Sequence, residues 1–186
     1  MSVFDRGRKR RYDGGVTDKS RYLVPQVLHD LREKMTFVAG PRQVGKTTLA
    51  RSLPGAKAGY LSWDVAGDRE RILRGELPPG KLWAFDEIHK YRQWRGLLKG
   101  LFDGRRAGQR ILVTGSARLD LYRRGGDSLQ GRYHHLRLYP LSLKEARCTL
   151  GDLMALGPFP EPLLAGSVAG ARRWSRQHRS LLVRED

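Results

Sequence analysis

The chain has 186 residues, enough for one sizeable α/β domain or for one domain and a fragment of another. It has no run of about 18 or more apolar residues and no apolar secretory signal, so we expect neither a membrane span nor export. A single cysteine, Cys148, excludes a disulfide framework and a cysteine-based metal site, and it indicates a reducing, cytoplasmic location.

The net charge of +17 predicts an anionic partner, and nucleic acid is the first candidate. The competing interpretation is solvated surface charge with no partner. No base-reading motif is visible, so binding would show little sequence preference. Two basic clusters stand out, one near each end of the chain: Arg6, Arg8, Lys9, Arg10 and Arg11, and Arg172, Arg173, Arg176 and Arg179.

Apolar runs and helical spacings alternate along the chain. Residues 1–20 lack apolar periodicity and are expected to form a flexible tail. The spacing then predicts helices over 24–33, 47–53, 94–102 and 169–183, and strands over 35–39, 59–63, 82–85, 110–114 and 134–139. A capping box at residues 142–145 predicts another helix, with Leu143, Ala146, Leu150 and Leu153 facing inward. Strands that alternate with helices predict an α/β fold with a parallel sheet and right-handed crossovers.

The most informative motif lies between the first expected strand and the helix after it. Residues 40–47, GPRQVGKT, match the phosphate-binding loop pattern G-x-x-x-x-G-K-[ST]. Its glycines let backbone N–H groups surround a phosphate, its lysine reaches the β- and γ-phosphates, and its threonine hydroxyl ligates Mg²⁺. The motif predicts a nucleotide site formed by Gly40, Pro41, Arg42, Gln43, Val44, Gly45, Lys46, Thr47 and Thr48.

An ATPase needs an acidic site beside this loop, and the strand at 82–85 ends in Asp86 and Glu87. We expect Asp86 to hold the Mg²⁺ that Thr47 also ligates. Glu87 would orient and deprotonate the attacking water as general base.

Two further elements are candidates for catalytic roles. The strand at 110–114 delivers two hydroxyls, Thr114 and Ser116, and either could position the water near the γ-phosphate. Arg132 precedes the last expected strand and could neutralise γ-phosphate charge, in its own site or in that of a neighbouring copy in a homo-oligomer.

Several blocks in order resemble the prokaryotic AAA+-type ATPases: GPRQVGKTT (40–48), YLSWD (60–64), FDEIHKY (85–91), WRGLLKGLFD (94–103) and 111–145. More narrowly, residues 21–165 resemble archaeal and bacterial ATP-binding proteins that continue into a C-terminal region of unknown function. The resemblance implies a P-loop NTPase core, a three-layer αβα sandwich with a sheet of about five strands in the order 5-1-4-3-2. It gives Lys46 and Thr47 the Walker A roles, Asp86 and Glu87 the Walker B roles, Thr114 or Ser116 the sensor role and Arg132 the finger role. The chain departs from that pattern in having no asparagine for the sensor.

These observations predict a tail at 1–20, a P-loop ATPase core at 21–156, and at 157–186 the truncated start of a C-terminal lid or second domain. The expected function is Mg²⁺-dependent hydrolysis of ATP to ADP and phosphate, coupled to a partner domain or to nucleic acid. The alternative is a non-hydrolysing nucleotide switch or nucleic-acid-binding module. A P-loop kinase is disfavoured by Glu87, which a kinase does not need, and a GTPase by the absence of asparagine for its guanine-reading motif.

Overall fold

The computed structural model describes residues 21–116 and 129–185. The chain divides into two compact units, one formed by residues 20–141 and one that includes residues 142–186. The expected tail at 1–20, with its basic cluster, lies outside the described residues.

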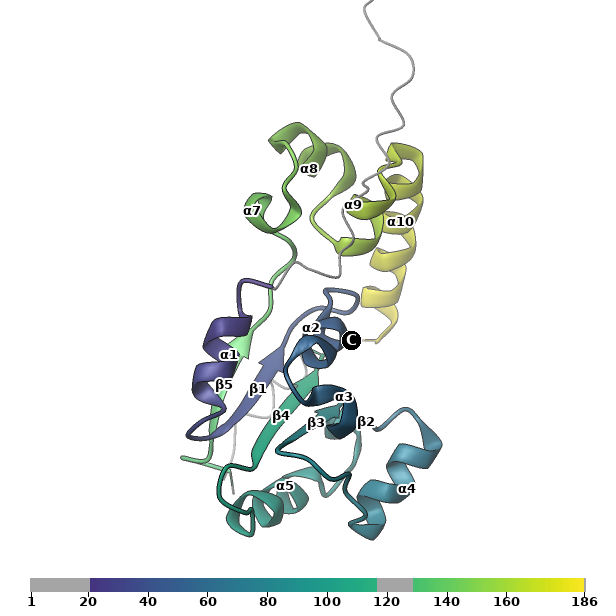
Figure 1. Ribbon diagram of the computed structural model, residues 1–186. Coiled ribbons are helices and arrows are strands. Elements are labelled where there is room, and N and C mark those ends of the chain that lie inside the picture. The colour runs from purple at the N-terminus through teal and green to yellow at the C-terminus, as the bar shows by residue number, and fades with distance from the viewer. Residues whose placement is uncertain (1–20, 117–128, 186) are drawn as a thin grey trace, which may run out of the picture. The chain divides into compact units, whose positions relative to one another are not determined.

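A five-stranded sheet forms the centre of the unit at residues 20–141, and all its strand pairs are parallel (Figure 1). The strand order is β2-β3-β4-β1-β5, which confirms the expected order of 5-1-4-3-2 read from the other edge. The strands are β1 (Met35–Ala39), β2 (Tyr60–Ser62), β3 (Leu82–Asp86), β4 (Arg110–Gly115) and β5 (Tyr133–Arg137).

β1 is buried along its whole length and β4 at all but its first residue, because both faces of the sheet are covered there. Helices flank the sheet, which confirms the α/β P-loop sandwich (Figure 1). They are α1 (Val24–Asp30), α2 (Lys46–Ser52), α3 (Ala56–Gly59), α4 (Ala66–Arg74) and α5 (Trp94–Asp103), with a short 3-10 helix, η2 (Ile88–Lys90).

One face of the sheet packs against α4 and α5. Phe37, Phe85 and Val113 project from this face and share a buried cluster with Ile72 of α4 and Leu98 of α5. The spacing of apolar residues predicted this helix, and its bounds agree with the expected 94–102 to within one residue. The polar residues of interest lie at the carboxyl ends of these strands.

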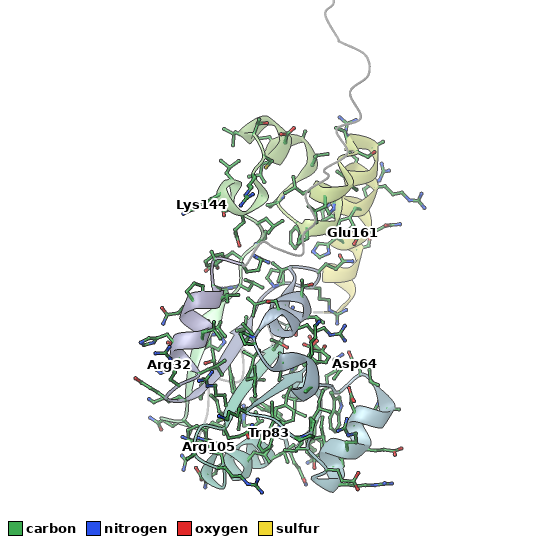
Figure 2. The ribbon with its side chains drawn as sticks, in the orientation of Figure 1. Arg32, Asp64, Trp83, Arg105, Lys144 and Glu161 are labelled. Atoms are coloured by element: carbon green, nitrogen blue, oxygen red, sulfur yellow. The ribbon has the colours of Figure 1, made fainter. Side chains whose placement is uncertain are left out.

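The second unit contains four helices among its described residues: α7 (Leu143–Ala146), α8 (Leu150–Leu156), α9 (Pro160–Ala165) and α10 (Val168–Glu185). The division at residue 142 falls before the boundary at 156/157 expected from the sequence, because α8 packs with α9 and α10. Figure 2 labels Lys144 on α7 and Glu161 on α9.

The capping box at Ser142 and Glu145 is confirmed, but the helix that it opens is shorter than expected. Arg147 has a φ of 48°, a left-handed conformation that ends α7, and Thr149 opens α8 with a second capping box. The prediction of one continuous inward-facing stripe was therefore wrong. Leu143 and Leu150 are exposed, whereas Ala146 is buried.

The basic helix expected at 169–183 is present as α10, and its four arginines at positions 172, 173, 176 and 179 are exposed. The helix packs against α9 through Trp174 and His178, whose rings lie 5.0 Å from the ring of Phe159. No helix in residues 21–116 and 129–185 is long and apolar enough to cross a membrane.

Candidate functional site

The loop at residues 40–47 leaves the carboxyl end of β1 in a conformation that requires glycine at two places. A side chain at Gly40 would place its Cβ 2.5 Å from the carbonyl oxygen of Leu138, which is too close for any real contact. Gly45 has a φ of 98°, a left-handed conformation that glycine adopts without strain. The sequence-predicted glycines are therefore structural requirements of this loop.

Lys46 lies against its own loop. Its side chain is buried, and Nζ donates hydrogen bonds to the carbonyl oxygens of Gly40, at 3.0 Å, and Pro41, at 2.8 Å. Burial lowers the pKa of Lys46, and the nearby carboxylates of Glu87 and Asp86 oppose that shift. The ammonium is thus held at the place where the motif predicts contact with phosphates.

Asp86, the last residue of β3, accepts hydrogen bonds from three hydroxyls. Thr47 Oγ1 lies 2.7 Å from Oδ2, Tyr60 Oη lies 2.5 Å from Oδ2, and Thr114 Oγ1 lies 2.6 Å from Oδ1. Thr47 lies in the first turn of α2, Tyr60 is the first residue of β2, and Thr114 lies at the carboxyl end of β4. Burial, and the hydrogen bond to Asp86, raise the pKa of Tyr60 to about 12, so its hydroxyl remains a donor at neutral pH.

Glu87 follows Asp86 in a left-handed conformation, with a φ of 56°. Its N–H donates to the carbonyl oxygen of Thr114 at 2.8 Å, which ties the turn to the end of β4. Its side chain is 20% exposed, and Oε2 lies 3.5 Å from Nε2 of His89 and 3.9 Å from Nζ of Lys90. Burial raises the pKa of Glu87, and the charges of Lys46 and Lys90 oppose that shift.

The strand-end hydroxyls at 114 and 116 have different surroundings. Thr114 is buried and bonds Asp86, whereas Ser116 Oγ lies 3.4 Å from Nε2 of His89. Both lie at the edge of the sheet that carries Asp86 and Glu87. The choice of sensor between them remains a prediction.

Taken together, residues 40–48, Asp86, Glu87, Thr114 and Ser116 meet at the carboxyl ends of β1, β3 and β4. A sequence profile described as an AAA domain matches residues 32–147 of the chain. The chain belongs to this AAA domain family. The resemblance to AAA+-type ATPases is confirmed, and the chain is a nucleotide-binding protein of that type.

Two curated relatives are uncharacterized proteins of Mycobacterium bovis and Mycobacterium tuberculosis. Each is 30% identical to this chain over 149 residues, which cover 77% of this chain and 34% of the relative. The chain therefore spans about a third of the length of the curated relatives that it matches.

Two solved structures show more distant similarity. A DNA polymerase III gamma subunit-related protein of Thermotoga maritima gives a TM-score of 0.45 at 12% identity, over 84% of this chain and 57% of that one. A signal transduction ATPase with numerous domains and a tetratricopeptide repeat sensor, from Pyrococcus horikoshii, gives 0.39 at 16% identity, over 75% and 26%.

Arg132 is the one predicted site residue that the fold does not bring to the loop. It lies before β5, and its carbonyl oxygen accepts a hydrogen bond from the N–H of Met35, the first residue of β1. In a parallel sheet all strands begin at one side and end at the other. Arg132 therefore lies at the amino ends of the strands, and the loop lies at their carboxyl ends. Its guanidinium binds Asp103 at the end of α5, with Nε 2.8 Å from Oδ1 and Nη2 3.2 Å from Oδ2.

Arg132 therefore cannot reach the phosphates in the site of its own chain and cannot act as its arginine finger. A finger role in the site of a neighbouring copy remains a prediction. Both partners of the ion pair lie at the surface, and the Asp103 hydrogen bond raises the pKa of Arg132, so the guanidinium stays charged. Arg105, labelled in Figure 2, marks the same end of α5.

If Arg132 acts in a neighbouring copy, adding the Arg132→Ala protein to wild type should lower the mixture's activity below the sum of its parts. Asp103→Asn is the matched control, because it breaks the ion pair and keeps the arginine. Steady-state phosphate release across mixing ratios measures the effect. Strictly additive mixtures would limit Arg132 to its ion pair with Asp103.

Sequence reasoning missed three polar residues of the site. Tyr60 and His89 lie within the blocks that resemble AAA+-type ATPases, and their places beside Asp86 and Glu87 depend on where strands end. Arg21 carried no signal, since it follows a segment with many cations. In the structure its guanidinium is buried beside the loop and donates to the carbonyl oxygen of Val44 at 2.6 Å.

Proposed function

We propose that this AAA domain binds ATP at residues 40–48 and hydrolyses it to ADP and phosphate. The observation that carries the proposal is the convergence of Lys46, Thr47, Asp86 and Glu87 at one edge of the sheet. Thr47 and Asp86 are hydrogen-bonded to each other, and the other two lie beside them. A nucleotide switch without turnover would not need a carboxylate at position 87.

The donor chemistry fits Mg²⁺. A threonine hydroxyl and an aspartate carboxylate, both oxygen donors, lie 2.7 Å apart at Thr47 and Asp86. No group of three His, Cys, Asp or Glu side chains in the described part of the chain could hold a metal, so the phosphate oxygens and water would complete the ligand set. When bound, Mg²⁺ neutralises charge on the β- and γ-phosphate oxygens.

The protein residues then have separate tasks. The loop N–H groups and Lys46 bind the phosphates, and Thr114 or Ser116 orients the attacking water. Glu87 accepts the proton of that water at a carboxylate oxygen. Its raised pKa strengthens it as a base, and the carboxylate must still be ionised to act.

Phosphate release from ATP, measured with and without Mg²⁺, tests the proposal. We expect turnover that depends on Mg²⁺ and stops when a chelator is added. Tight ATP binding without phosphate release would instead support the non-hydrolysing switch. A cytoplasmic location, suggested by the single Cys148, is part of the same proposal.

We further propose that hydrolysis is coupled to nucleic acid or to a partner domain, as the net charge of +17 and the exposed arginines of α10 favour. Affinity for a nucleic acid should fall steeply with salt, because each neutralised phosphate releases a condensed counterion. Removing residues 1–11, which carry five cations, should reduce the log–log salt slope by up to about 4 and leave ATP binding unchanged.

Titration of labelled single-stranded and duplex DNA at several salt concentrations measures this slope. Replacing Arg172, Arg173, Arg176 and Arg179 with glutamine gives the matched test of the other cluster. If the intact chain does not bind nucleic acid even at low salt, the net charge is solvated surface charge. The hydrolysis would then be coupled to a protein partner.

A further inference from the structure

Arg21 joins the loop at residues 40–47 to the segment that follows β5. Its Nη1 donates to the carbonyl oxygen of Val44 and its Nη2 to the carbonyl oxygen of Tyr139, each at 2.6 Å. The residue is only 9% exposed, although it stands at the start of the described chain. Both acceptors are backbone atoms, so the guanidinium constrains main-chain positions.

The bond to Val44 fixes the orientation of a whole peptide group. The described chain has no cis peptide, so the C=O of Val44 and the N–H of Gly45 lie in one plane and point in opposite directions. A guanidinium that holds the carbonyl on one side therefore directs the Gly45 N–H to the other side. In the loop motif, backbone N–H groups of this kind bind phosphate.

The peptide between Val44 and Gly45 could rotate if the guanidinium of Arg21 did not pack against it. Gly45 lacks a side chain and has a φ of 98°, so its backbone has more freedom than that of any other residue type. A Cβ built on Gly45 would lie 3.1 Å from Nη1 of Arg21, which shows that the guanidinium packs directly on this backbone. Arg21 thus limits the movement that the glycine permits.

The other half of the loop is fixed by the same segment. Leu138 N–H donates to the carbonyl oxygen of Ala39 at 2.8 Å, and the carbonyl oxygen of Leu138 packs on Gly40. The segment at 138–139 therefore holds the start of the loop directly and its end through Arg21. An arginine suits this place because its planar fork donates in two fixed directions, which a lysine ammonium cannot do.

From this geometry we infer that Arg21 is a positioning residue, which aims the Gly45 N–H into the phosphate cradle. The inference rests on the proposed function, because it assumes that the loop binds a nucleoside triphosphate. Arg21 acts through Gly45, and its contribution concerns the phosphates and not the base or the ribose.

The test measures the affinity of inorganic pyrophosphate and of ATP by calorimetry, for wild type, Arg21→Lys and Arg21→Ala. We expect a loss of about tenfold or more for both ligands in Arg21→Ala, as for one charged hydrogen bond, and a smaller loss in Arg21→Lys. Hydrogen exchange of the peptide that spans residues 40–47, without ligand, should be faster in both variants.

Two matched controls separate positioning from general stability. Tyr22→Phe removes the neighbouring hydroxyl, which donates to the carbonyl oxygen of Arg137 at 3.1 Å and accepts from the N–H of Tyr139 at 3.4 Å, and it leaves both hydrogen bonds of Arg21 in place. Arg32→Ala removes an exposed arginine elsewhere in the same unit, labelled in Figure 2. Both should keep wild-type pyrophosphate affinity, whatever they do to the thermal midpoint.

If Arg21 contributes only to stability, the Arg21 variants should have a lower thermal midpoint and a pyrophosphate affinity within twofold of wild type. That result would overturn the inference. If Arg21→Ala does not fold, Arg21→Lys decides by the same criterion. The proposed function is tested separately: it fails if Lys46→Ala binds ATP with the same affinity as wild type. Exchange at residues 40–47 that matches wild type in the Arg21 variants would still overturn the inference in that case.

Discussion

Replacing Lys46 with alanine is expected to weaken ATP binding about a hundredfold or more. Hydrogen bonds to charged groups contribute about 1.5–3 kcal/mol each. Loss of the two hydrogen bonds from the ammonium to the β- and γ-phosphates would weaken the affinity by at least about two powers of ten. Lys46 is buried and its charge acts on the carboxylates of Asp86 and Glu87, so the variant would also remove one cation from beside them and leave Lys90 near Glu87. Calorimetry or a fluorescent ATP analogue measures the loss.

Lys57→Ala is the control, because Lys57 is exposed on α3 and lies outside the loop. It should bind ATP as wild type does. The loop would not be the nucleotide site if Lys46→Ala bound ATP within about twofold of wild type while remaining folded.

Replacing Glu87 with glutamine should separate binding from chemistry. Glutamine keeps the shape of the side chain and most of its hydrogen bonds, and it cannot accept a proton from water. We expect ATP to bind and persist, with kcat lower by about 10²–10⁴, the usual contribution of a general base. Single-turnover phosphate release with ATP in limiting amount measures the chemical step.

The pH dependence gives an independent check of the same residue. Burial raises the pKa of Glu87, and a base must be ionised, so activity should fall as the pH decreases through a value above that of an ordinary glutamate. The acid limb should disappear in Glu87→Gln. Glu70→Gln, on the exposed face of α4, is the control. Wild-type turnover in Glu87→Gln would remove Glu87 from the role of base.

The sheet and the edge that carries the site could be predicted from the sequence, because buried parallel strands appear as short apolar runs. Asp86 was assigned from its place directly after such a run, and the structure puts it beside Thr47. Apolar runs indicate which residues are buried, and they do not indicate which strand lies beside which. The resemblance to AAA+-type ATPases supplied their order, which periodicity does not contain.

Other features depend on information that no local pattern holds. The end of α7 is set by one left-handed residue, Arg147, which is not a residue type that predicts such a conformation. Arg132 was assigned by its place before a strand, without regard to which edge of the sheet that place occupies. Arg21 reaches Tyr139 across most of the chain, and nothing in either neighbourhood indicates the pair.

The position of β1 between β4 and β5 has a consequence for synthesis of the chain. Its partners are residues 112–115 on one side and residues 133–137 on the other, so both pairings are distant in sequence. While residues 35–47 leave the ribosome, the strand that ends in the loop has neither neighbour, and its apolar residues are open to other chains. Non-local parallel pairing of this kind folds slowly. A chain stopped before residue 133 would therefore leave one edge of β1 unpaired, and we expect such fragments to aggregate when they are expressed alone.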